Sequence, residues 1–157
     1  MCPEMTKSRK RRISGADVVE EARRWVGTPY RHQAAVLGVG CDCIGLVRGV
    51  ADRLGVMPVD DWSMIGAYSR TPSPLRMGEH MRRWLLPVNQ PQDGDIAWIE
   101  WREGMPMHLA ILAHGPNGPS LIHSYENVGR VVEHSFSGEW PARVQSWWRI
   151  PALKGSK

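Results

Sequence analysis

The apolar pattern of this chain changes period near Asp93, and that change most constrains the fold. Before this point, apolar residues follow the spacing of amphipathic helices. After it, five stretches have the character of strands and are separated by turn residues: DIAWIEW, MHLAILA, SLIHSY, GRVVEHSF and RVQSWWRI. Helices followed by consecutive strands predict an α+β domain, in which N-terminal helices pack on an antiparallel β-sheet. A length of 157 residues suits one such domain.

Helix starts and stops place three helices, over Gly15–Trp25, Cys43–Leu54 and Pro74–Leu86. Ser14 can cap the first helix, and Gly55 ends the second. Proline in the first turn is compatible with the third. We expect a glycine-rich loop at residues 31–40 and an irregular segment at residues 56–73.

Two cysteines, Cys41 and Cys43, stand one residue apart before the second helix. Zinc sites usually need about four ligands in C-x₂₋₄-C pairs, and the chain has no second pair, although His32 could add a ligand. A redox pair would require C-x-x-C spacing. Burial as small apolar side chains is the main structural alternative.

The position of Cys43 also fits a nucleophile. Asp42 is a good N-cap and places Cys43 in the first turn, where unpaired N–H groups and the helix dipole stabilise a thiolate. The same N–H groups could stabilise an oxyanion. Cys41 lies before the helix and lacks these advantages.

A cysteine nucleophile needs a base, and two histidines are placed to act together. A tight turn pairing Gly115 with Gly118 puts Ala110 opposite His123, so that His108 and His123 become diagonal neighbours on one sheet face, about 7–8 Å apart between backbones. A register shift of one residue would separate them onto opposite faces. His114 shares the parity of His108 but lies six residues away, roughly 20 Å along a strand, and cannot serve the same site. His32, His80 and His134 carry no such pairing argument and are expected at the surface or the core edge.

The N-terminal segment is strongly basic, with charges at Lys7, Arg9, Lys10, Arg11 and Arg12, and the whole chain has a net charge of +4. We expect an arm at residues 1–13 followed by one domain at residues 14–157. The arm could be a solvated tail or a docking strap, or could bind nucleic acid or an anionic membrane. It lacks the apolar region of a secretory signal, and no apolar run is long enough for a membrane span.

Five segments resemble the successive motifs of the NlpC/p60 cell-wall cysteine peptidases: GTPYRHQ at 27–33, GVGCDCIGLV at 38–47, QDGDIAWI at 92–99, MHLAIL at 107–112 and LIHS at 121–124. The resemblance covers about residues 14–150, and more narrowly the chain resembles the small members found among tail genes of phages and gene transfer agents. The resemblance implies a papain-like fold, with a cysteine-bearing helix packed on an antiparallel sheet that carries the histidines.

The resemblance also implies roles for residues. Cys43 would be the nucleophile, His108 the base and His123 the residue that orients the base. Tyr30 matches a tyrosine beside the nucleophile, and Asp42 an aspartate that helps bind a free substrate amine; their structural alternatives are a core aromatic and the N-cap alone. The family usually has serine where this chain has Ile44, which puts amine recognition in question.

The activity implied is that of a peptidoglycan endopeptidase cutting a stem peptide, typically between γ-D-glutamate and a diamino acid, without cofactor or metal. Such a protein would be made in the cytoplasm, carried by a virion or particle tail to the cell wall, and bound to baseplate or hub proteins. Two alternatives remain: a structural baseplate protein with a vestigial site, and a papain-like amidase or acyltransferase. A nucleic-acid module is supported by the basic arm alone.

Overall fold

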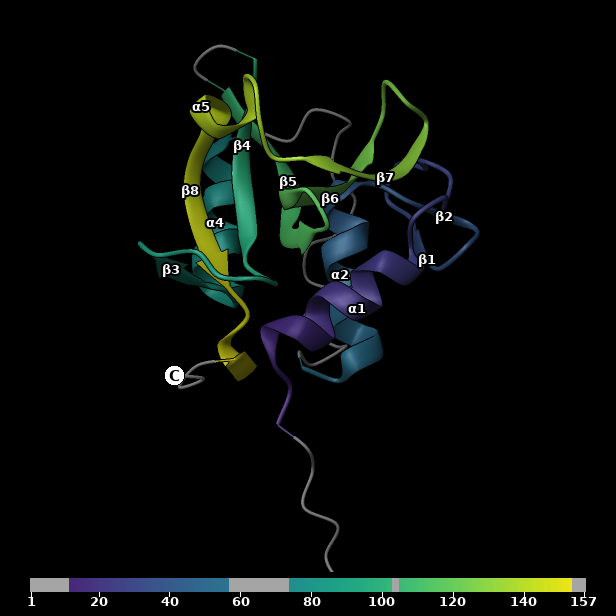
Figure 1. Ribbon diagram of the computed structural model, residues 1–157, viewed down its shortest axis with the longest axis horizontal. Coiled ribbons are helices and arrows are strands. Elements are labelled where there is room, and N and C mark those ends of the chain that lie inside the picture. Colours follow the sequence, from purple (N-terminus) through teal and green to yellow (C-terminus); the bar gives the residue numbers. More distant parts are fainter. Residues whose placement is uncertain (1–11, 57–73, 103–104, 154–157) are drawn as a thin grey trace, which may run out of the picture.

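The computed structural model describes residues 12–56, 74–102 and 105–153. The basic arm, except for its last two residues, and nearly all of the segment expected to be irregular lie outside the described residues. Within the described part of the chain, the predicted helices and the predicted strands follow one another in the predicted order (Figure 1).

Two helices carry the N-terminal half, and both begin and end where local signals place them. Helix α1 spans Gly15–Arg24, and its cap Ser14 forms a reciprocal capping box with Asp17. Helix α2 spans Cys43–Leu54, begins at the cap Asp42 and ends at Gly55, which has the left-handed φ of 65° that favours glycine. Both predicted helices are therefore confirmed.

The third predicted helix is shorter than expected. Helix α4 spans Pro74–Trp84, and the chain then enters the edge strand β3, Leu86–Val88. An edge position tolerates Pro87, which has no N–H to donate. Leu86 pairs with Arg149 in this strand, so it cannot also continue the helix.

Among the described residues, the main sheet is antiparallel and has six strands in the order β3-β8-β4-β5-β6-β7. The five predicted strands are all present as β4 (Ile96–Arg102), β5 (Met105–Gly115), β6 (Gly118–Tyr125), β7 (Arg130–Ser135) and β8 (Val144–Arg149). Sequence analysis did not identify the short elements β1 (Ala35–Val36), β2 (Gly40–Cys41), α5 (Trp140–Arg143) and the 3₁₀ turn Pro151–Leu153.

Side chains from the two faces of the sheet enter different apolar clusters. On one face, Leu109, Ile111 and Ile122 pack with residues of α1, α2 and α4 in the main core. On the other face, Ala110, Leu112 and Leu121 pack with side chains from the C-terminal segment, including Trp140 of α5. This alternation confirms the period-two pattern read from the sequence.

The hairpin between β5 and β6 has the predicted register. Gly115 pairs with Gly118, and the ladder continues back to the Ile111–Ile122 pair. Beyond it, β5 pairs with β4 at His108, and the β4–β5 register shifts immediately after this pair. Such irregularities re-aim side chains at functional sites, and here the shift adjoins a candidate catalytic residue.

Candidate active site

Cys43 is the first residue of α2 and is half-buried. The Asp42 carboxylate accepts hydrogen bonds from the backbone N–H groups of Gly45 and Gln33, each at 2.7 Å. It therefore caps the helix and also attaches the preceding loop to the helix start. Gly45 cannot be larger without a shift, because an added Cβ would lie 1.8 Å from the carbonyl oxygen of Ala34.

Helix α2 packs against strand β5 of the sheet. Backbone hydrogen bonding from Leu109, the residue after His108, and from Ile44 and Cys43 at the helix start favours the Cys43 thiolate. These bonds lower the thiol pKa, as the helix-start position predicted. Burial, assisted by the Asp42 charge, outweighs them and raises the pKa of Cys43 to about 12, so the resting group is a neutral thiol.

Cys41 has a structural environment. It is fully buried in β2, and its backbone carbonyl accepts a 2.7 Å hydrogen bond from the Ser124 hydroxyl. Burial raises the pKa of its thiol to about 11. With no exposed surface, Cys41 is a core residue, in agreement with the sequence analysis.

His108 and His123 meet on one face of the sheet. Nε2 of His108 lies 2.6 Å from Nδ1 of His123, and the rings are edge-to-face with centroids 4.9 Å apart. Both side chains are buried, at 6% and 0% exposed. The predicted pairing of these two histidines is therefore confirmed, whereas their catalytic roles stay a prediction.

Burial holds both rings in the neutral form. Desolvation, with further contributions from Arg143 and His134, lowers the pKa of His108 to about 3. Desolvation, with further contributions from His108, His134 and Arg143, lowers the pKa of His123 to about 2. At neutral pH each ring thus has one N–H donor and one nitrogen acceptor.

A third histidine, His134, joins the pair. The sequence predicts this residue at the surface or core edge and gives no pairing argument for it. Nε2 of His134, on β7, lies 2.7 Å from Nε2 of His123. The β6–β7 register sets His134 opposite Leu121, and therefore on the face that carries His123. The alternation of side chains along β7 could have indicated that His134 shares a face with His123. That inference requires the β6–β7 register, which depends on the turn between Tyr125 and Arg130.

Aromatic side chains enclose the histidines. The His123 ring is stacked on Tyr125 and lies edge-on to Trp140, with both centroids 5.2 Å away. Trp140 also contacts the His134 ring at 4.9 Å and carries the Arg143 guanidinium over its own face. Trp140 and Arg143 both belong to α5, so this short helix covers the histidines and adds positive charge beside them.

Asp42 directly precedes Cys43, and Tyr30 lies opposite Cys41, two residues before Cys43. Tyr30 is half-buried and forms a bridge with Cys41, and its backbone N–H bonds to the Gly129 carbonyl. Asp42 is only 3% exposed, with both carboxylate oxygens accepting backbone N–H groups. Substrate binding by either residue remains a prediction.

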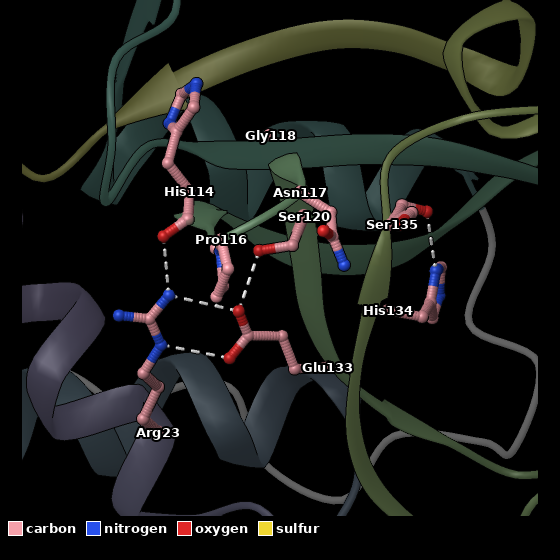
Figure 2. A pocket seen from close by; sticks show the side chains of 10 residues that line it. Arg23, His114, Pro116, Asn117, Gly118, Ser120, Glu133, His134 and Ser135 are labelled. Atoms are coloured by element: carbon pink, nitrogen blue, oxygen red, sulfur yellow. Dashed lines mark hydrogen bonds and ion pairs between the residues drawn. The ribbon is translucent and has the colours of Figure 1, made fainter.

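The other histidines have separate surroundings. His32 lies 3.7 Å from the Asp42 carboxylate, and His114 contacts the carboxylate of Asp93. His114 lines an open hollow of about 590 Å³, together with an Arg23–Glu133 ion pair (Figure 2). His134 lines the same hollow, so the third histidine of the row reaches a surface depression.

Among the described residues, no group of three or more His, Cys, Asp or Glu side chains is arranged to hold a metal ion. In the same part of the chain, no helix combines the length and apolarity needed to cross a membrane.

No protein-family model matches the sequence, and no curated protein matches it. Solved structures do match. The NlpC/p60 domain of the peptidoglycan hydrolase SagA is 23% identical, with a TM-score of 0.57 over 87% of this chain and 98% of that domain. The fold is that of NlpC/p60 domains.

Two further structures have this fold. NlpC1 from Trichomonas vaginalis is 17% identical, with a TM-score of 0.63 over 87% of this chain and 44% of that one. An N-acetylmuramoyl-L-alanine amidase from Bacteroides uniformis is 13% identical, with a TM-score of 0.59 over 87% and 98%. The chain thus spans nearly all of the SagA domain and of the amidase, but under half of NlpC1. The papain-like α+β fold implied by the sequence motifs is confirmed.

Proposed function

We propose that this protein is a cysteine peptidase that hydrolyses an amide bond in the stem peptide of peptidoglycan. One observation carries the proposal: His108 on β5 is hydrogen bonded to His123 on β6, and helix α2, which begins at Cys43, packs against both strands. Nucleophile, base and orienting residue in this order are the parts of a catalytic triad. The NlpC/p60 fold, shared with a peptidoglycan hydrolase and a cell-wall amidase, supports peptidoglycan as the substrate.

The proposed reaction begins from neutral groups. As the Cys43 sulfur attacks the scissile carbonyl carbon, its proton passes to Nδ1 of His108, because Nε2 is bonded to His123. The carbonyl electrons move to oxygen, and the N–H groups at the start of α2 stabilise the oxyanion. Collapse of this intermediate breaks the carbon–nitrogen bond, and the leaving amine takes the proton from His108.

A thioester on Cys43 remains after the amine has left. His108 then removes a proton from water, whose oxygen attacks the thioester carbonyl. Breaking the carbon–sulfur bond releases the carboxylic acid and returns the proton to the sulfur. His123 keeps the His108 ring oriented in both half-reactions, as the third member of a triad does. No step of this scheme calls for a cofactor.

Substrate recognition rests on Tyr30 and Asp42 in this proposal. Both lie beside Cys43 in the motifs that resemble the family, and Asp42 supplies negative charge near the nucleophile. Ile44 offers no hydroxyl where the family usually has serine. We therefore infer weaker recognition of a free substrate amine than the family pattern implies, with the bond between γ-D-glutamate and the diamino acid as the expected target.

The proposed setting is the tail tip or baseplate of a phage-like particle or gene transfer agent. Its support is the motif resemblance to small tail-associated members and the basic arm at residues 1–13, which suits docking to an acidic partner protein. The enzyme would open the wall locally for DNA entry. The arm and the domain at residues 14–157 would thus have separate functions.

A second activity has its own support. The Bacteroides uniformis amidase has the same fold, so cleavage between muramic acid and the stem peptide is the main alternative. The test is digestion of purified peptidoglycan, followed by mass spectrometry of the released fragments. Endopeptidase action leaves L-alanyl-γ-D-glutamate on the disaccharide, whereas amidase action removes the whole stem.

Two cysteine variants serve as test and control in this digestion. Cys43→Ala should release no fragments, while Cys41→Ala, which removes the buried neighbouring thiol, should retain the native pattern. Absence of fragments with folded native protein would refute the peptidase and favour a structural protein with a vestigial site.

A further inference from the structure

His108, His123 and His134 form a row joined by hydrogen bonds. A backbone carbonyl determines which nitrogen donates and which accepts in each of these bonds. Nδ1 of His134 lies 2.9 Å from the carbonyl oxygen of Ser135, an interaction drawn in Figure 2. A carbonyl oxygen can only accept, so Nδ1 of His134 must carry the hydrogen. In the neutral ring, Nε2 of His134 is then the acceptor.

This direction propagates to the other rings. Nε2 of His134 lies 2.7 Å from Nε2 of His123, so His123 must donate its hydrogen there. Because the His123 ring is neutral, its Nδ1 is an acceptor, and it receives the hydrogen of His108 Nε2 at 2.6 Å. His108, also neutral, is left with an unprotonated Nδ1.

We propose that His134 is a positioning residue, which, through the Ser135 carbonyl, sets the tautomer of His123 and His108 and keeps Nδ1 of His108 free of a proton. This inference rests on the proposed function, because that nitrogen is the one that takes the proton of Cys43. His134 acts through two other rings and is not itself expected to touch substrate.

Reversing the direction of donation along this row would prevent His108 from acting as the base. If the residue at position 134 donated to His123 Nε2, then His123 Nδ1 would carry the hydrogen and donate to His108 Nε2. The hydrogen of neutral His108 would move to Nδ1, where it blocks proton transfer from the thiol. In a Ser-His-Asp triad a wrong tautomer lowers kcat by roughly 10⁴-fold.

The position of His134 makes this testable. Its side chain is half-buried and lines the open hollow, so substitution need not disturb the core. His134→Glu offers only acceptors to His123, whereas His134→Lys offers only donors. Asn117→Lys, on the exposed turn that lines the same hollow, is the control for an added cation.

The first measurement is the ¹⁵N chemical shift of the histidine ring nitrogens, in the Cys43→Ala background to prevent turnover. We expect the hydrogen of His108 on Nε2 in the parent protein, in His134→Glu and in Asn117→Lys, and on Nδ1 in His134→Lys. A His108 tautomer unchanged in a folded His134→Lys protein would overturn the proposal. This readout needs no substrate, so it stands even if peptidoglycan is not cleaved.

The second measurement is hydrolysis by the variants with Cys43 intact. We expect His134→Glu and Asn117→Lys to stay within about threefold of the native kcat, and His134→Lys to lose at least tenfold in kcat with KM little changed. Equal losses in the Glu and Lys variants would mean that His134 serves packing alone. Thermal unfolding of each variant verifies that the comparison is made on folded protein.

Discussion

Nε2 of His108 lies 2.6 Å from Nδ1 of His123, across two antiparallel strands that join residues 15 apart in sequence. The contact uses one nitrogen of each ring. The strands hold both rings in place, so the orientation of the base is part of the sheet and does not depend on a loop.

The raised thiol pKa predicts how Cys43 reacts. With a pKa of about 12, the thiolate fraction is small at pH 7 and increases about tenfold per pH unit up to that value. We expect slow alkylation by iodoacetamide at neutral pH, a rate that continues to rise above pH 9, and an adduct on Cys43 in preference to buried Cys41. A rate that levels off below pH 8 would instead indicate a resting thiolate–imidazolium pair.

The two buried histidines predict acid sensitivity of the fold. In the unfolded chain each binds a proton as the pH falls through about 6.5, whereas the folded-state pKa values are about 3 for His108 and 2 for His123. Between these values the unfolded state binds more protons, so the free energy of unfolding decreases as the pH is lowered, by up to about 1.4 kcal/mol per pH unit for each ring.

Urea unfolding between pH 7.5 and pH 4.5 measures this slope. A double variant, His108→Gln with His123→Gln, should flatten it, while His80→Gln in α4 should leave it near the native value. The same slope in the double variant would show that other groups cause the acid sensitivity.

Gly45→Ala separates helix propensity from packing. Alanine should stabilise an exposed helix by about 1 kcal/mol relative to glycine. Here the new Cβ would lie 1.8 Å from the Ala34 carbonyl, so we expect destabilisation of about 1–3 kcal/mol and reduced activity through displacement of the loop before Cys43. Gly115→Ala, with its nearest atom 3.9 Å away, is the control. A stabilised Gly45→Ala protein would contradict the tight loop contact.

Ile44 predicts a small preference for substrates with a free amine. A charge-assisted hydrogen bond contributes about 1.5–3 kcal/mol, equivalent to roughly 10- to 150-fold. We expect kcat/KM for a free stem peptide to exceed that for its N-acetylated form by less than about tenfold, and Ile44→Ser to widen the ratio. A large preference in the native protein would show that Asp42 and Tyr30 recognise the amine without the serine.

The basic arm predicts a separable docking function. Deleting residues 1–12 removes its positive charges but leaves the Ser14 capping box of α1. We expect incorporation into particles to fall and peptidoglycan hydrolysis in solution to survive. Unchanged incorporation accompanied by loss of DNA binding would favour the nucleic-acid alternative.

Much of this architecture is encoded in local sequence. Caps at Ser14 and Asp42 place the starts of α1 and α2, and the glycine at position 55 places the end of α2, because they satisfy helix ends through neighbours in the chain. Helix α1 ends at Arg24, one residue before the predicted Trp25. The Gly115–Gly118 turn determines the β5–β6 register, and register with period two determines that His108 and His123 share a face. Local rules therefore predicted the core of the site.

Tertiary structure alone decided the rest, because the deciding contacts come from segments distant in sequence. His134 joins the row through the β6–β7 register; the Trp140 ring of α5 packs against His134, and the Arg143 guanidinium lies over that ring. The protonation state of the Cys43 thiol also depends on packing. The helix start lowers the thiol pKa, as the sequence predicts, but burial raises it by a larger amount. Desolvation depends on all the atoms that exclude water from a group, and only the assembled fold specifies those.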